Sequence, residues 1–241
     1  MKGKKGKDNW PKAIFYDSKN TLFAWDTVWI RACSNILQKY GSNVDPEDFW
    51  RRWAGFMSGE NFKVAFGKYR EFTESLQISL ADAFRYFGVP GDPRDVKVLT
   101  DLWDAVQPYP DTAAALTRQQ ELTKVFIFSN VETVYLQMMV DKIGGGFRPD
   151  FLGDMQKSHC CKPSPRAYRW VLEQVGLEAK DVIYCAGPQW DVQGAMAFGM
   201  KGAWVHRPYR TTKEVQGVPY DYEVDDLHGL TRIIESTLLG A

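Results

Sequence analysis

Short apolar runs that alternate with helical patterns constrain the fold of this chain most. From residue 108 onward, the runs 125–128, 181–186 and 203–206 are strand-length, and helical segments over 131–142, from Asp191 to Gly199, and over 225–238 separate or follow them. This alternation is typical of a parallel sheet with crossover helices. An earlier run, Ala13-Ile14-Phe15-Tyr16, begins soon after Pro11 and is predicted to be the first buried strand. The predicted fold class is therefore α/β.

Residues 24–107 have a different, helical pattern. Helices are predicted from Val28 to Tyr40, from Asp45-Pro46 onward, and over 61–76, 79–87 and 94–106. Asp45 before Pro46 is typical of a helix start, and Gly88 is suited to end the helix over 79–87. The sequence thus predicts an α/β core of residues 13–23 and 108–241, an inserted helical domain of residues 24–107, and a flexible basic tail of residues 1–12.

Composition excludes several classes of partner. Thirty basic and thirty acidic residues give a formal net charge of zero, so no broad field attracts nucleic acid or a membrane surface. No apolar stretch approaches the roughly 18 residues of a spanning helix, and the lysine-rich start lacks a signal-peptide apolar segment. We expect a cytoplasmic protein without nucleic-acid or membrane partners.

The cysteines and histidines show no metal-binding spacing. Cys33, Cys160, Cys161 and Cys185 form no C-x-x-C pair and are expected to be free thiols. The three histidines are scattered along the chain, so no metal site is predicted from them.

Polar residues follow the predicted strands. Asp17 follows the first strand, Ser129-Asn130 follow 125–128, Asp191 follows 181–186, and Lys162 precedes a predicted helix. In open α/β sheets, ligands bind beyond the carboxyl ends of the strands. Singly, these residues have structural alternatives, such as helix caps, turn residues or a surface charge. Their combination on these elements instead predicts one active site.

This order of residues resembles the haloacid dehalogenase superfamily. Its fold is a three-layer, Rossmann-like core with an aspartate nucleophile after the first strand and a cap inserted behind it. The resemblance covers the chain from residue 13 onward. Within the superfamily it points to the L-2-haloacid dehalogenase branch, on the segments Trp50-Arg51, Phe128-Ser129-Asn130, Lys162-Pro163-Ser164-Pro165-Arg166-Ala167-Tyr168 and Trp190-Asp191.

The resemblance implies a role for each site residue. Asp17 would attack a small carboxylic acid substrate and form an ester, and Asp191 would position or activate the hydrolytic water. Lys162 would hold Asp17 ionised, while Thr21 and Ser129 would orient it. Arg51 in the cap would receive the departing anion or the substrate carboxylate, with Arg52 as the alternative. The implied substrate-binding residues are Lys19, Asn130, Tyr168 and Trp190.

The departures from the superfamily bear on the reaction. Its phosphatases place an aspartate two residues after the nucleophile and a pair of acids in the last motif, to hold magnesium. Here Lys19 and the single Asp191 occupy those segments, which makes a poor magnesium site. The expectation is a metal-independent reaction without a cofactor.

Four functions remain open. The first hypothesis is release of halide from a small 2-haloacid. The second is hydrolysis of a strained-ring acid such as cis-epoxysuccinate or azetidine-2-carboxylate. Phosphatase or phosphonatase activity and a non-catalytic binding fold rank lower. Lys19 replaces the branch's usual tyrosine and offers a proton to a leaving oxygen or nitrogen, while Asn20, Ala186 and Pro188 also depart from the branch. A homodimer is one of the oligomeric states left open, because dimers are common in the branch.

Overall fold

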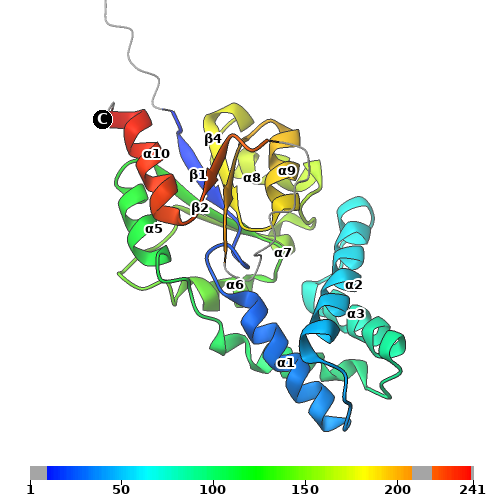
Figure 1. The fold of residues 1–241 in the computed structure, drawn as a ribbon. Helices are drawn as coiled ribbons and strands as arrows, with labels where there is room; N and C mark the ends of the chain where they lie inside the picture. The colour runs from blue at the N-terminus through cyan, green and yellow to red at the C-terminus, as the bar shows by residue number, and fades with distance from the viewer. Residues whose placement is uncertain (1–9, 208–218, 240–241) are drawn as a thin grey trace, which may run out of the picture.

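A parallel sheet lies at the centre of the chain. The computed structural model describes residues 10–207 and 219–239, and within them the strand order is β3-β2-β1-β4-β5-β6 (Figure 1). Every neighbouring pair in the sheet is parallel. The strands are β1 (Ala13–Tyr16), β2 (Lys124–Ser129), β3 (Phe151–Asp154), β4 (Val182–Ala186), β5 (Lys201–Val205) and β6 (Tyr222–Val224).

The strands with long apolar runs were predicted, and two short strands were not. The strands expected at 13–16, 125–128, 181–186 and 203–206 are confirmed as β1, β2, β4 and β5, with ends that differ by up to two residues. The sequence analysis missed β3, which reads Phe-Leu-Gly-Asp, and β6, which reads Tyr-Glu-Val. Neither has the length or the continuous apolar character of a recognisable buried strand, so their pairing comes from tertiary context.

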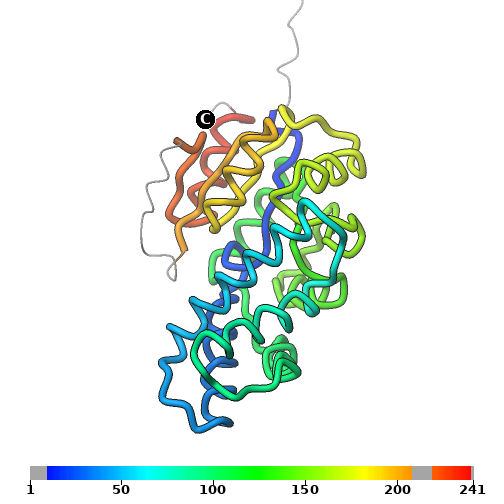
Figure 2. The backbone as a smooth tube through the Cα atoms, turned by 90° about the vertical axis from the view of Figure 1, so that its right-hand side faces the viewer, coloured from blue at the N-terminus to red at the C-terminus, as the bar shows by residue number. Residues whose placement is uncertain are grey.

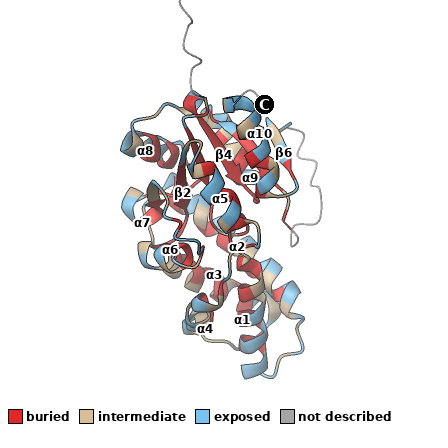
Figure 3. Cartoon of the chain, turned by 90° about the vertical axis from the view of Figure 1, so that its left-hand side faces the viewer, coloured by how far each residue is buried: buried red, intermediate tan, exposed pale blue. Residues whose placement is uncertain are grey.

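Helices cover both faces of the sheet and make three layers. Alternate residues of β1 point to opposite faces. Ile14 and Tyr16 belong to the same buried cluster as side chains of α5 (Thr112–Gln120) and α10 (Leu227–Leu239). Ala13 and Phe15 cluster with α8 (Pro165–Val175) and α9 (Gln189–Phe198). The strands are consequently buried between these helices, as Figure 3 shows in red.

Between β1 and α5 the chain is helical, as predicted, but the boundaries of the helices differ from the prediction. The helices are α1 (Trp25–Lys39), α2 (Pro46–Phe66), α3 (Phe72–Phe87) and α4 (Val96–Asp101), with 3₁₀ turns at Pro93–Asp95 and Trp103–Ala105. The predicted helix over 61–76 is wrong, because α2 ends before Gly67. A Cβ atom at Gly67 would lie 2.6 Å from the carbonyl oxygen of Lys63, so this turn requires glycine.

The expected helix ends are confirmed at both positions. The Asp45 side chain accepts hydrogen bonds from the backbone N–H groups of Glu47 and Asp48. Gly88 ends α3 with a left-handed φ of 66°. After β2 follow α6 (Thr133–Val140), α7 (Met155–Ser158) and the 3₁₀ turn Ala179–Asp181.

The helices α1 to α3 form a body beside the carboxyl ends of the strands (Figures 1 and 2). An antiparallel bridge joins Phe23 to Pro108, so the two connections between this body and the sheet run side by side. The division of the chain into an α/β core and a helical domain of residues 24–107 stays a prediction.

The prediction of a flexible tail is wrong for Trp10 and Lys12, which lie at the end of that segment. The Trp10 indole donates to the carbonyl of Lys180 at 2.8 Å, and the Lys12 backbone N–H donates to the carbonyl of Asp181 at 2.8 Å. Residues 1–9 lie outside the described residues. The four cysteines are buried free thiols, as expected. Among the helices described, none is both long enough and apolar enough to cross a bilayer.

Candidate active site

The polar residues singled out in the sequence meet at one edge of the sheet. Asp17 follows β1 directly, Ser129 is the last residue of β2, and Asp191 lies in the first turn of α9, which follows β4. Parallel strands present their carboxyl ends at the same edge, so three distant segments converge there. Asp17 is only 5% exposed.

Lys162 links the two carboxylates. Its ammonium, with no exposed surface, donates to Asp17 Oδ1 at 2.9 Å, to Asp191 Oδ2 at 2.5 Å and to the hydroxyl of Tyr184 at 2.5 Å. Burial alone would lower the pKa of Lys162, but Asp17 and Asp191 outweigh it and the pKa is raised. The ammonium therefore stays charged and fixes the position of the Asp17 carboxylate.

Asp191 lies behind Lys162 and is fully buried. Its Oδ1 accepts from the Tyr168 hydroxyl at 3.0 Å, and its Oδ2 accepts from the Tyr184 hydroxyl at 2.9 Å as well as from Lys162. Burial raises the pKa of Asp191 to about 6, against the opposing effect of Lys162. These contacts use three of the roughly four acceptor positions of a carboxylate. The expected contact of Asp191 with water stays a prediction.

Thr21 holds the second oxygen of Asp17. Its hydroxyl donates to Asp17 Oδ2 at 3.0 Å and accepts from the backbone N–H of Gly187 at 2.9 Å. A Cβ atom at Gly187 would lie 2.0 Å from the carbonyl oxygen of Asn20, so only glycine lets the two loops approach this closely. Each oxygen of Asp17 thus has its own donor.

Ser129 and Asn130 lie at the site. Ser129 is paired with another group than the expected Asp17, and the substrate contact expected of Asn130 stays a prediction. The Ser129 hydroxyl is 2.6 Å from the hydroxyl of Ser18, and no contact with Asp17 is found among the described residues. The Asn130 amide donates to the Lys162 carbonyl and accepts from the Lys162 N–H, both at 2.8 Å. Asn130 therefore holds the backbone that carries Lys162.

A cavity of about 100 Å³ adjoins Asp17. A cavity of this size suits a small ligand. The sheet edge and the loops after the strands contribute Asp17, Lys19, Asn20, Asn130, Pro188 and Trp190. The helical body contributes Trp25, Asp26, Trp29, Trp50, Ala54, Met57, Ser58, Asn61 and Phe72. Core and helical insert together enclose the space that Asp17 faces.

Lys19 forms part of this cavity wall. Its ammonium donates to the Asn130 carbonyl at 2.7 Å and lies 3.6 Å from the centre of the Phe72 ring. Burial lowers the pKa of Lys19 to about 7, although Asp17 raises it. Near neutral pH the side chain is therefore present in both its charged and its neutral form.

Arg51 does not reach the cavity, contrary to expectation. Its side chain is 61% exposed and pairs with Glu47 and Asp48 on the same helix. The face of α2 that lines the cavity carries Trp50, Ala54, Met57, Ser58 and Asn61. These residues recur every three or four positions, whereas Arg51 is one position, about 100°, further round the helix.

The alternative, Arg52, also lies elsewhere. Its guanidinium donates to the hydroxyl of Tyr86, and both arginines line a separate surface hollow with Asp48 and Phe87. Neither arginine belongs to the lining of the cavity beside Asp17.

The sequence analysis missed Tyr184 and Arg207. Tyr184 lies inside β4, and its hydroxyl contacts both Lys162 and Asp191. Arg207, after β5, donates to the Thr21 carbonyl at 2.8 Å and pairs with Asp111. A tyrosine within an otherwise apolar buried strand was the available signal, since its hydroxyl needs a partner.

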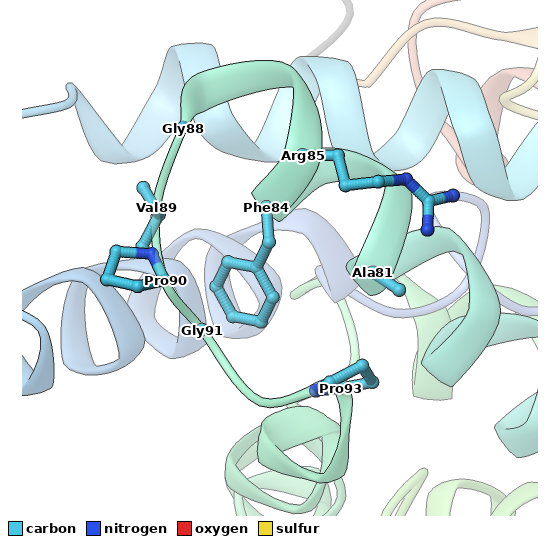
Figure 4. Close-up of a pocket in the computed structure, with 8 residues that line it drawn as sticks. All are labelled: Ala81, Phe84, Arg85, Gly88, Val89, Pro90, Gly91 and Pro93. Carbon is cyan, nitrogen blue, oxygen red and sulfur yellow. The ribbon is translucent and has the colours of Figure 1, made fainter.

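A larger cavity lies at the end of α3, away from the sheet (Figure 4). It measures about 330 Å³, and the ring of Phe84 packs under the turn from Gly88 to Gly91. Its one charged side chain, Arg85, pairs with Asp82. This cavity brings together no reactive groups.

The donor set beside Asp17 does not suit a divalent cation. The described residues contain no group of three or more histidine, cysteine, aspartate or glutamate side chains arranged to hold a metal. The Lys162 ammonium occupies the space between the carboxylates of Asp17 and Asp191. Magnesium requires oxygen ligands there, so a magnesium site does not fit these residues.

Comparison with curated proteins gives relatives along most of the chain. Haloacetate dehalogenase H-2 from Moraxella sp. (strain B) is 25% identical over 224 residues, 92% of this chain and 97% of that protein. An (S)-2-haloacid dehalogenase from Pseudomonas sp. (strain YL) is 24% identical, and the match covers 93% of this chain and 95% of that protein. A phosphatase of Mycobacterium tuberculosis is 27% identical, and the match covers 92% of this chain and 96% of that protein. No family model matches the chain.

Solved structures show the same fold. The L-2-haloacid dehalogenase of Xanthobacter autotrophicus superposes with a TM-score of 0.77 at 23% identity, covering 93% of this chain and 98% of that chain. A second structure of that enzyme, with chloropropionic acid covalently bound, also gives a TM-score of 0.77, at 22% identity with the same coverage. The chain therefore has the fold of the L-2-haloacid dehalogenases, and it is similar in sequence to haloacid dehalogenases along most of its length.

Proposed function

We propose that the protein is a hydrolase that releases halide from a small 2-haloacid through an ester on Asp17. The observation that carries this proposal is the fixed carboxylate of Asp17. Thr21 holds one of its oxygens, Lys162 holds the other, and the carboxylate lines a cavity of about 100 Å³. A carboxylate that is positioned and paired with a cation in this way is suited to attack a saturated carbon.

The proposed reaction has two steps. An Asp17 oxygen bonds to the 2-carbon while the carbon–halogen bond breaks, and its electron pair leaves with the halide. Water then attacks the carboxyl carbon of Asp17, and Asp191 accepts a proton from that water. The ester bond breaks, the 2-hydroxy acid takes up a proton, and the Asp17 carboxylate is restored.

The relatives support this reaction over phosphoryl transfer. Two of the relatives described above carry dehalogenase names, and a related enzyme has been solved with chloropropionic acid covalently bound. A relative named as a phosphatase keeps phosphoryl transfer as an alternative. Against it stand Lys19, two positions after Asp17, and the ammonium between the two carboxylates.

Hydrolysis of a strained-ring acid is the second candidate, and Lys19 favours it. Opening an epoxide or azetidine ring leaves an alkoxide or an amide anion, which needs a proton that halide does not. The pKa of Lys19, lowered to about 7 by burial, suits a donor in this cavity.

A substrate panel separates these reactions. We expect halide release from chloroacetate or 2-chloropropionate, measured by ion chromatography, with full activity in the presence of a chelator. Acid titration with cis-epoxysuccinate and azetidine-2-carboxylate reports ring opening. Turnover of a phosphate ester that a chelator abolishes, without turnover of any of these acids, would contradict the proposal.

Lys19→Tyr distinguishes the two leaving groups. If Lys19 donates a proton, the variant should lose ring opening by about 10²-fold or more while halide release persists. In the native protein, ring opening should also fall as pH rises above about 7, because the charged form of Lys19 is then lost. Equal loss of ring opening and halide release in Lys19→Tyr would show that Lys19 acts on the nucleophile Asp17 and not on the leaving group.

A further inference from the structure

Among the described residues, no arginine lines the cavity beside Asp17 to receive a departing anion, because Arg51 and Arg52 line a separate hollow. The lining of the cavity beside Asp17 nevertheless includes buried polar atoms without a hydrogen-bond partner among the described residues. These are the indole nitrogens of Trp29 and Trp50 and the side-chain oxygen of Asn61. Buried polar groups in folded proteins are nearly always paired, so this concentration in one small cavity requires an explanation.

The two indoles come from different helices of the same wall. Trp29 lies on α1 and is only 6% exposed, and Trp50 lies on α2. An indole N–H can donate but cannot accept, so the natural partner for both is an electron-rich or anionic atom. Trp29 and Trp50 line the same cavity as Asp17.

Packing holds Trp29 in place. Its ring lies 5.2 Å from that of Trp53 in an edge-to-face arrangement and 5.9 Å from that of Trp25. Trp53 in turn donates its own indole N–H to the Ser79 hydroxyl at 3.0 Å and the Leu76 carbonyl at 3.2 Å. A donor that packing holds rigidly does not have to reorganise when charge develops.

We propose that the indole N–H groups of Trp29 and Trp50 bind the departing halide, an inference that rests on the proposed function. In the displacement, the Asp17 oxygen attacks from the sheet side, and the carbon–halogen electron pair leaves with the halogen on the opposite side. The halogen gains a full negative charge there without needing a proton. Lys19, on the core wall, is the cation available to the substrate carboxylate.

Halide binding to the resting enzyme tests the inference directly. Sodium bromide is titrated into the native protein, Trp29→Phe, Trp50→Phe and Trp170→Phe at constant ionic strength, with the heat of binding measured calorimetrically. We expect each of the first two variants to bind bromide about tenfold to a hundredfold more weakly than the native protein. Trp170→Phe, a change of the same kind on α8 outside the cavity lining, should keep the native affinity.

The outcomes are separable. Native affinity for bromide in both cavity variants overturns the inference, as does failure of the native protein to bind bromide. A parallel titration with acetate tests binding of the substrate carboxylate. If the two cavity variants lose affinity for acetate but not for bromide, the indoles bind the carboxylate, and the inference is wrong. Trp50 is half-buried, so Trp50→Phe stands as a test even if Trp29→Phe does not fold. Failure of the proposed function would instead appear as no halide release by a native protein that still binds bromide.

Discussion

Replacing Asp17 with asparagine is expected to lower halide release by at least about 10⁴-fold, because an amide cannot form the ester. Asparagine has nearly the same size and can still accept the hydrogen bond from Thr21, which is 3.0 Å long in the native chain. The loss should therefore arise from chemistry rather than from a rearranged site. Initial rates with chloroacetate give the effect, and circular dichroism reports whether the variant is folded.

Asp154→Asn is the matched control for this prediction. Asp154 is also a fully buried carboxylate, at the end of the parallel strand β3, but it contacts Thr133 and the backbone of Lys157 and lies outside the cavity lining. Asp154→Asn should keep most of the activity. Comparable loss in both variants would mean that any buried carboxylate at this edge is needed for folding, and would remove Asp17 from its proposed role.

Replacing Lys162 with methionine is expected to abolish activity and to lower the free energy of unfolding by about 3–5 kcal/mol. The ammonium lies between Asp17 and Asp191, and its removal leaves two buried carboxylates without their shared cation. Urea unfolding followed by circular dichroism measures the loss. Lys97→Met is the control, since it breaks an exposed pair with Asp101 and should change stability little.

The variant also has a predicted pH signature. Burial already raises the pKa of Asp191 to about 6 in the native fold, and loss of Lys162 raises it further. A carboxyl whose pKa is higher in the folded than in the unfolded state favours folding at low pH and loses that contribution as pH rises. The deficit of Lys162→Met relative to the native protein should therefore be smaller at about pH 5 than at about pH 8. An equal deficit at both values would contradict the electrostatic explanation.

The sequence predicted the sheet and the convergence of its strand ends, because both follow from local patterns. Apolar runs mark β1, β2, β4 and β5, and parallel pairing then brings Asp17, Ser129 and Asp191 to one edge. Lys162 was expected beside Asp17 from the resemblance. The donation from its ammonium to Asp17 at 2.9 Å places it there.

The sequence did not reveal which side chains of α2 turn toward the cavity, nor which distant residues form hydrogen bonds with each other. A shift of one position round α2 separates Trp50, in the cavity wall, from Arg51, which is exposed. Tyr184 reads as one more apolar strand residue until its hydroxyl is seen against Lys162. Ser129 pairs with Ser18 because two strand ends happen to be adjacent, which no local pattern records.

A single turnover in oxygen-18 water, with enzyme in excess over chloroacetate, tests the ester on Asp17 most directly. If water attacks the carboxyl carbon of Asp17, the heavy oxygen enters Asp17, and the hydroxy acid released carries the light oxygen that Asp17 held before. Mass spectrometry of the product and of the peptide containing Asp17 reads both positions. Heavy oxygen in the first product, with an unlabelled peptide, would mean that water attacks the substrate directly, and the account of Asp17 as nucleophile would be wrong.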